Sequence, residues 1–114
     1  MSRRTVGKTE EVWFTGSTSF FYTGLSVSVP AKTVYAIDFA IVYANTGPDS
    51  ILISYSSTNI DPYNTAVRGN SSSKAYVCGY NEKNSPITFY VWGKYQYAGT
   101  RNYAEASYCF DTVN

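Results

Sequence analysis

The sequence contains no histidine, and its 114 residues include only two cysteines and four prolines. Without histidine there is no Ser-His or Cys-His nucleophile pair, no imidazole general base and no imidazole metal ligand. The two cysteines lack Cys-x-x-Cys spacing, so they predict neither a zinc site nor a disulfide scaffold. We therefore expect no metal and no cofactor.

Carboxylates are the catalytic groups that remain. Glycoside hydrolysis requires two carboxyl groups that face each other across the substrate, but most acidic residues here fall in predicted turns or near the ends. Gly-rich phosphate loops and dinucleotide fingerprints are also absent. We expect no catalytic residue, predict that the protein is not an enzyme, and interpret its acidic residues as surface charges. These residues are Glu10, Glu11, Asp38, Asp49, Asp61, Glu82, Glu105 and Asp111.

Charge is scarce, at 15% of residues, with a formal net charge of +1. Nucleic-acid binding needs several cations at the phosphates, and the one basic pair here is Arg3-Arg4, so we expect no nucleic-acid partner. No apolar run approaches about 20 residues, which argues against membrane insertion. Residues 1–15 lack the layout of a signal peptide. We expect synthesis in the bacterial cytoplasm, followed by retention there or export by another route, or else a fragment of a longer chain; the polar start favours the fragment.

Aromatic residues are abundant instead, with twelve tyrosines, six phenylalanines and two tryptophans. Tyrosine suits half-buried strands and is also enriched at binding surfaces. The composition therefore indicates β structure first and molecular recognition second.

Strand patterns dominate the chain, and no segment of ten residues or more has a clean helical period. The longest strand, residues 33–44, is apolar on both faces, which predicts cover on both sides; Asp38 on one of these faces then needs a partner. Residues 45–49 form a turn cluster. Cys78 and Cys109 are either two buried small side chains or one disulfide. The predicted strands are residues 11–15, 20–23, 25–29, 33–44, 51–56, 65–69, 74–80, 87–97 and 103–113.

These strands lack helical crossovers, so they should pair antiparallel in a sandwich or barrel. We predict an all-β, antiparallel jelly-roll sandwich of about nine or ten strands. Residues 1–10 are expected to be a flexible N-terminal lead-in, and residues 11–114 a single domain.

Two motifs carry a family resemblance. The stretch Val29-Pro30-Ala31-Lys32-Thr33-Val34-Tyr35-Ala36-Ile37 and the later run from Phe89 to Gly99 lie about fifty residues apart, before one final strand. In this order and spacing they resemble C1q/TNF-like jelly-roll domains, including the heads of phage tail fibres. The chain departs from that family's pattern at Thr33, where glycine is usual, and at Asn84-Ser85, where Gly-Asp is frequent.

The resemblance implies a homotrimer in which the sheet that holds the last strand lines the three-fold axis. It therefore implies a trimer interface on two predicted strands of this chain, residues 33–44 and 103–113. The alternative is a monomeric sandwich with a well-covered sheet. The interface residues predicted in this way are Val34, Ala36, Asp38, Tyr108 and Phe110.

The surplus of aromatic residues predicts a binding surface, because a core of this size does not need twenty aromatic side chains. Aromatic rings flanked by amides, carboxylates or guanidinium groups suit sugars and protein surfaces. The alternative for each tyrosine is a strand-end residue that covers the edge of the sandwich. The candidate ligand-binding residues are Tyr63, Tyr80, Asn81, Tyr97, Arg101 and Tyr103.

Three functional hypotheses follow. The first is a non-catalytic trimeric head of a phage tail fibre that binds a bacterial cell-surface glycan or protein, located in the virion tail or at an extracellular surface. The second is a structural trimerisation domain of a fibrous protein. The third is a monomeric carbohydrate-binding module.

Overall fold

The computed structural model describes residues 2–43 and 47–113. The end of the predicted long strand and the start of the following turn, residues 44–46, lie outside the described residues. The only helical segment described is a short 3-10 turn, η1 (Pro62–Asn64), and no described helix is long and apolar enough to cross a membrane. The strands are β1 (Ser2–Lys8), β2 (Val12–Thr15), β3 (Phe21–Val29), β4 (Thr33–Val42), β5 (Ser50–Ser54), β6 (Thr65–Asn70), β7 (Lys74–Asn81), β8 (Ile87–Lys94) and β9 (Arg101–Val113).

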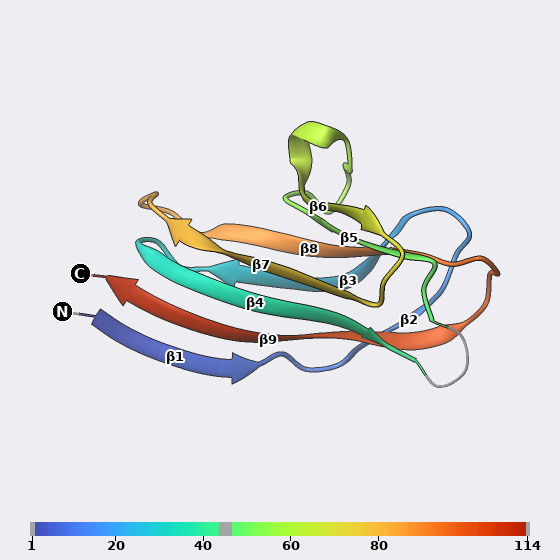
Figure 1. The fold of residues 1–114 in the computed structure, drawn as a ribbon, viewed down its shortest axis with the longest axis horizontal. Coiled ribbons are helices and arrows are strands. Elements are labelled where there is room, and N and C mark those ends of the chain that lie inside the picture. The colour runs from blue at the N-terminus through green and yellow to red at the C-terminus, as the bar shows by residue number, and fades with distance from the viewer. Residues whose placement is uncertain (1, 44–46, 114) are drawn as a thin grey trace.

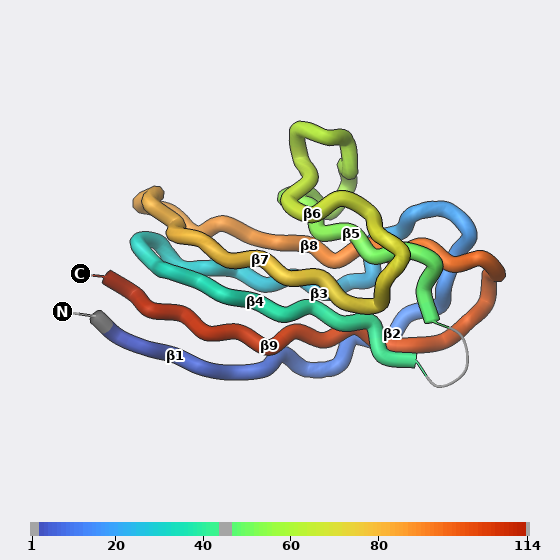
Figure 2. Tube along the Cα trace, viewed as in Figure 1, coloured from blue at the N-terminus to red at the C-terminus, as the bar shows by residue number. Residues whose placement is uncertain are grey.

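The strands form two stacked antiparallel sheets (Figure 1). The first sheet has the order β1-β9-β4-β7, with β2 continuing the edge of β1 along β9, and the second has the order β3-β8-β5-β6. From β2 to β9 the chain crosses between the sheets at every connection except β5–β6, as the trace in Figure 2 shows. The predicted all-β antiparallel sandwich is confirmed. The jelly roll stays a prediction, and this strand order is compatible with it.

The core lies between the facing sides of the sheets, where alternate residues of each strand point inward. Phe89 of β8 is fully buried, and its ring centroid lies 5.4 Å from that of Tyr35 and 6.3 Å from that of Phe39. On β4, Ile37 and Ile41 are buried on this same side. The alternation visible in the sequence therefore places these side chains correctly.

The opposite face of β4 is exposed, contrary to the prediction that both faces are covered. Val34 and Asp38 lie on this side and are exposed to solvent. The reason is that the second sheet covers only one side of the first. Asp38 therefore needs no buried partner, because its carboxylate remains in water. We call the uncovered side of the first sheet the outer face.

The two strands predicted at residues 20–23 and 25–29 correspond to one strand, β3, which begins at Phe21. Its register against β8 shifts between Tyr22 and Ser26, around Gly24, whose φ is +97°. Glycine adopts such a φ readily, so the strand bulges there without ending. The glycine inside this strand pattern is therefore a bulge and not a turn.

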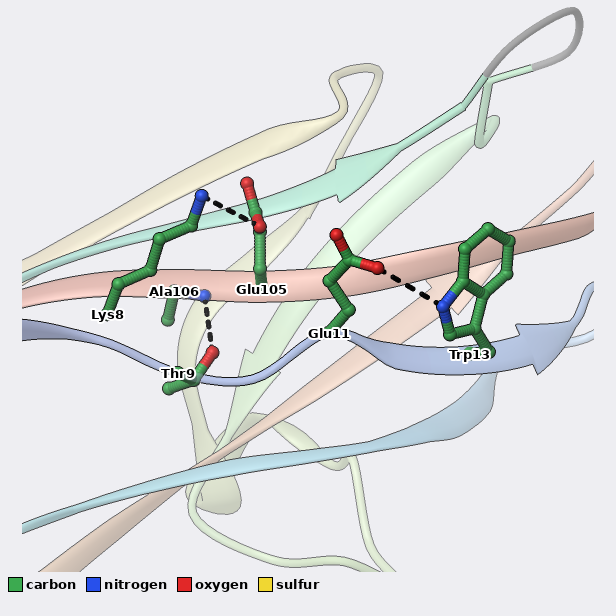
Figure 3. Close-up of polar contacts among 6 residues, drawn as sticks. All are labelled: Lys8, Thr9, Glu11, Trp13, Glu105 and Ala106. Carbon is green, nitrogen blue, oxygen red and sulfur yellow. Dashed lines mark hydrogen bonds and ion pairs between the residues drawn. The ribbon is translucent and has the colours of Figure 1, made fainter.

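The N-terminal segment differs from the flexible lead-in that the sequence predicts. Residues 2–8 form β1, which pairs with β9 from Ser2↔Val113 to Lys8↔Ser107. At the break between β1 and β2, the Thr9 amide donates to the Ala106 carbonyl oxygen (2.8 Å) and the Thr9 hydroxyl accepts from the Ala106 amide (2.9 Å; Figure 3). Backbone pairing with β9 places the segment, and such pairing has little signature in side-chain patterns.

Candidate functional site

The six predicted ligand-binding residues lie in three separate places. Tyr63 is 96% exposed in η1, on a loop that stands away from the sandwich (Figure 1). Tyr80 and Asn81 end β7. Tyr97, in the turn before β9, lies with Arg101 and Tyr103 of β9 toward the opposite end. The structure therefore does not bring the six residues together into one site.

Asn81 has a structural position that differs from the predicted ligand contact. Its side chain is only 2% exposed, and its amide nitrogen lies 3.0 Å from the carbonyl oxygens of both Pro30 and Ser85 and 3.4 Å from that of Val29. Its side-chain oxygen accepts from the Lys83 amide. Asn81 therefore ties two turns together and has no free amide hydrogen to offer a ligand.

A shallow depression of about 440 Å³ lies beside Tyr80. Ile87, Glu82 and Lys83 contribute to its lining, together with the half-exposed ring of Tyr55. These side chains supply mixed polar and apolar surface without a convergent set of ionisable groups, so no particular chemistry is indicated there.

The predicted trimer-interface residues divide between opposite faces of the first sheet. Val34, Ala36 and Asp38 lie on the outer face of β4. Phe110 pairs directly with the inward-facing Tyr35 and is buried in the core, and Tyr108 packs against the same core and stacks on Phe110 at 4.7 Å. The five residues therefore cannot form one interface. The error arose because the prediction followed the family resemblance, which places the last strand at the three-fold axis. The charged residues of β9, Arg101, Glu105 and Asp111, all lie on the opposite face from Tyr108 and Phe110, and this pattern indicates which face is buried.

The register of the outer face places both cysteines in one row. Ala36 of β4 is opposite Cys109 on one side and Cys78 on the other, and Cys109 is opposite Val6 of β1. Val6 is 72% exposed, and the neighbouring positions Val34, Tyr76 and Tyr80 are also exposed. We call this outer-face surface the thiol patch; its members are Val6, Val34, Ala36, Tyr76, Cys78, Tyr80 and Cys109.

Neither cysteine belongs to a disulfide, and the two cannot form one with each other. Cys78 is exposed and Cys109 half-buried. Each is a direct cross-strand neighbour of Ala36, so their Cα atoms lie about 10 Å apart across two strand spacings. A disulfide requires about 4.4–6.8 Å. The sequence left two alternatives, buried thiols or one disulfide within the chain, and the structure contains neither.

Charged and polar groups border the two thiols. The Arg4 Nε donates to Cys109 Sγ at 3.3 Å. This hydrogen bond raises the pKa of the exposed Arg4 guanidinium above its ordinary value, and Asp111 adds to the effect. Across the patch, Cys78 raises the pKa of Tyr76. Both thiols therefore lie at the surface within reach of polar neighbours.

A second cluster lies at the other end of the outer face. Trp13 of β2 pairs with Tyr103 of β9, and their ring centroids are 4.9 Å apart. The Arg101 guanidinium lies 5.7 Å from the centroid of the Trp13 ring, and the indole Nε1 donates to Glu11 at 3.3 Å. We call Glu11, Trp13, Arg101 and Tyr103 the aromatic platform.

Trp13 was not among the residues that the sequence predicted for binding. It alternates with Phe14, which is buried in the core, so the pattern shows that one of the two must face outward. Glu11 and Thr15 share a face with Trp13, whereas Val12 shares a face with Phe14, so the polar neighbours were the signal that could have identified Trp13 as the outward ring. The pairing with Tyr103 and Arg101 depends on the register of β2 against β9.

Comparison with known proteins shows no matching family model and no matching curated protein. Among solved structures, the chain is similar to a protein of Bacillus endospore appendages, which are described as "a novel family of disulfide-linked pili". The sequence identity is 14%, the TM-score is 0.46, and the match covers 99% of this chain and 92% of the other. At this level of similarity no role is transferred from that protein.

Proposed function

We propose that this chain is a non-catalytic structural subunit that assembles with copies of itself through the thiol patch, with disulfides between chains. The observation that carries the proposal is the position of Cys78 and Cys109. Both lie on the outer face, and they are too far apart to bond within one chain. Any disulfide that they form joins two molecules.

The surroundings of the thiols favour a second protein surface as the partner. Val6, Val34 and Tyr80 expose apolar area next to them, and such area is stabilised by burial. Arg4 and Asp111, a directly opposed pair at the edge of the patch, supply both signs of charge. Most soluble oligomers consist of identical chains, so we propose a second copy of this chain as the partner.

Two thiols per chain allow each copy to link to two others. Each bond uses one thiol from each of two chains; with glutathione disulfide as oxidant, two chain thiols become one disulfide and two glutathione thiols are released. Such bonds persist in oxidising surroundings, so we propose that the assembly functions outside the cell or on a virion. A fibre or appendage is the architecture that two linkages per subunit support.

The test is oxidation of the reduced protein with glutathione disulfide, followed by non-reducing electrophoresis and light scattering. The wild-type chain should form a ladder of multimers that reductant dissolves. Cys78→Ser and Cys109→Ser should each stop at dimers, and the double variant should form no covalent species.

A matched control gives the rate at which an exposed thiol outside the patch forms disulfides between chains by random collision. Asn84→Cys in the double-serine background places one thiol outside the patch, in the exposed turn that follows β7. Cross-linking through the native cysteines should be faster than through this position. Equal rates, or a wild-type chain that remains monomeric with both thiols free, would refute the assembly role.

The copy number and the biological setting of the assembly are also proposals. From the resemblance to C1q/TNF-like domains, we propose a homotrimer within a phage tail fibre. Light scattering of the reduced protein tests the copy number, since non-covalent association through the thiol patch does not require the disulfides. Binding of a bacterial surface receptor is a second candidate, favoured by the aromatic platform at the other end of the outer face.

A further inference from the structure

The aromatic platform has features that the assembly role does not explain. Trp13 is 51% exposed although it is a large aromatic side chain. It lies at the opposite end of the outer face from the cysteines, beyond the ion pair between Lys8 and Glu105 (3.0 Å). Figure 3 shows Glu11, Trp13, Lys8 and Glu105 projecting to the same side of the sheet. The platform is therefore an open surface of the single chain.

Its shape is shallow and small. A depression of about 190 Å³ is formed by Trp13, Tyr103 and Arg101 together with Val42 and Tyr43 of the neighbouring strand region. Tyr43 is also exposed. Rings and an aliphatic side chain thus border a space of the order of one sugar ring, open to solvent.

The polar groups at the platform complement a neutral ligand rich in hydroxyl groups. The Glu11 carboxylate accepts hydrogen bonds, the Arg101 guanidinium donates them, and neither belongs to an ion pair within the described part of the chain. With one charge of each sign beside the rings, a net anionic or cationic ligand gains little overall. The flat C–H face of a pyranose can pack on an indole ring, while its hydroxyl groups reach the two charged side chains.

We propose that the aromatic platform binds a neutral pyranose unit of a glycan chain. This proposal rests on receptor binding, the second candidate function above, and specifies the class of its ligand. Trp13 supplies the stacking surface, Tyr103 holds the indole in position, and Glu11 and Arg101 orient the sugar hydroxyls. The site is independent of the thiol patch, so it does not require assembly.

The test is a titration of the reduced, ¹⁵N-labelled protein with the neutral tetramer of N-acetylglucosamine, with maltotetraose and tetragalacturonic acid in parallel. The two tryptophans give separate indole N–H signals, and the second serves as an internal control. Trp92 is buried, and its Nε1 donates to the Ser56 carbonyl oxygen at 3.0 Å. A neutral tetramer should shift the Trp13 signal and leave the Trp92 signal in place, and the acidic tetramer should bind more weakly.

Variants separate stacking from folding. Trp13→Ala should weaken binding by about tenfold or more, and Trp13→Phe should retain part of it, because a smaller ring still stacks. Tyr63→Ala removes an even more exposed ring far from the platform and should leave binding unchanged. Thermal unfolding of each variant shows whether the fold is intact.

Two results would overturn the proposal. The first is an unmoved Trp13 signal with both neutral tetramers at about 10 mM, beyond which affinity would be too weak to matter. The second is an equal loss of binding in Tyr63→Ala and Trp13→Ala. Either result would leave a protein contact as the use of this surface, and because the titration is done with reduced protein, the assembly role would be unaffected.

Discussion

Ala36 lies between the two cysteines, and Ala36→Cys should therefore create the disulfide that the wild-type chain cannot form. In an antiparallel sheet, the N–H and C=O of one residue point to the same neighbouring strand, so Ala36 forms a hydrogen-bonded pair with one cysteine and a non-hydrogen-bonded pair with the other. The Cα separations in such pairs are about 5.5 and 4.5 Å, and both lie within the range of a disulfide.

The expected stabilisation follows from the length of chain that the bond closes. Bonding to Cys78 closes a loop of about 40 residues and bonding to Cys109 one of about 70, for which chain entropy predicts about 4 kcal/mol before any strain is subtracted. With strain, about 2–4 kcal/mol remains. In a domain of this size, that corresponds to a rise in Tm of the order of 10 °C.

The assay combines peptide mapping by mass spectrometry with thermal unfolding, each with and without reductant. The oxidised variant should contain a disulfide from position 36 to one native cysteine within the same chain, so that the remaining native thiol can link it to one other chain at most. Its Tm should fall when reductant is added. Ala40→Cys is the matched control, since Ala40 lies on the same face of β4 but opposite Lys74 and Glu105. If the new thiol at position 36 remains free, or behaves like that at position 40, then the register that places the cysteines in one row is wrong.

Two further predictions concern buried polar groups. Asn81→Ala should lower the free energy of unfolding, measured by urea titration, by about 1–3 kcal/mol, because the buried backbone carbonyls lose their donor. The control is Asn84→Ala in the exposed turn nearby, which should change the free energy of unfolding by less than about 0.5 kcal/mol. Equal effects of the two variants would contradict the structural role of Asn81. Burial raises the pKa of Tyr95, which is neutral in the folded chain and accepts from Asn102 at 2.8 Å. A raised pKa in the folded state means stability that is complete below the unfolded value of about 10 and is lost as pH rises beyond it. The stability advantage of wild type over Tyr95→Phe should therefore shrink above about pH 10, and a constant difference would show that Tyr95 ionisation is not linked to unfolding.

The candidate surfaces were only partly predictable from sequence. Tyr103 and Arg101 were predicted to bind a ligand, and the structure makes them neighbours on the outer face. Their main partner, Trp13, comes from a strand about ninety residues away in the chain. The interface prediction failed at Tyr108 and Phe110 because it followed the family resemblance, although the charged residues of β9 all lie on the opposite face of that strand. Asn81 resembled a loop residue that contacts ligand, and its buried hydrogen bonds to two distant carbonyls have no local signature.

The sequence by itself determined the class of fold, since runs of alternating β-branched and aromatic residues between turn residues specify strands and their faces locally. It also determined that histidine chemistry is absent. Tertiary structure alone decided that one apolar face of β4 is uncovered, because that depends on where the second sheet lies. It also decided that the two cysteines share one exposed row and cannot meet, and that Trp13 joins Tyr103. These last features depend on register between strands distant in the chain, where a shift of one residue moves every side chain to the other face.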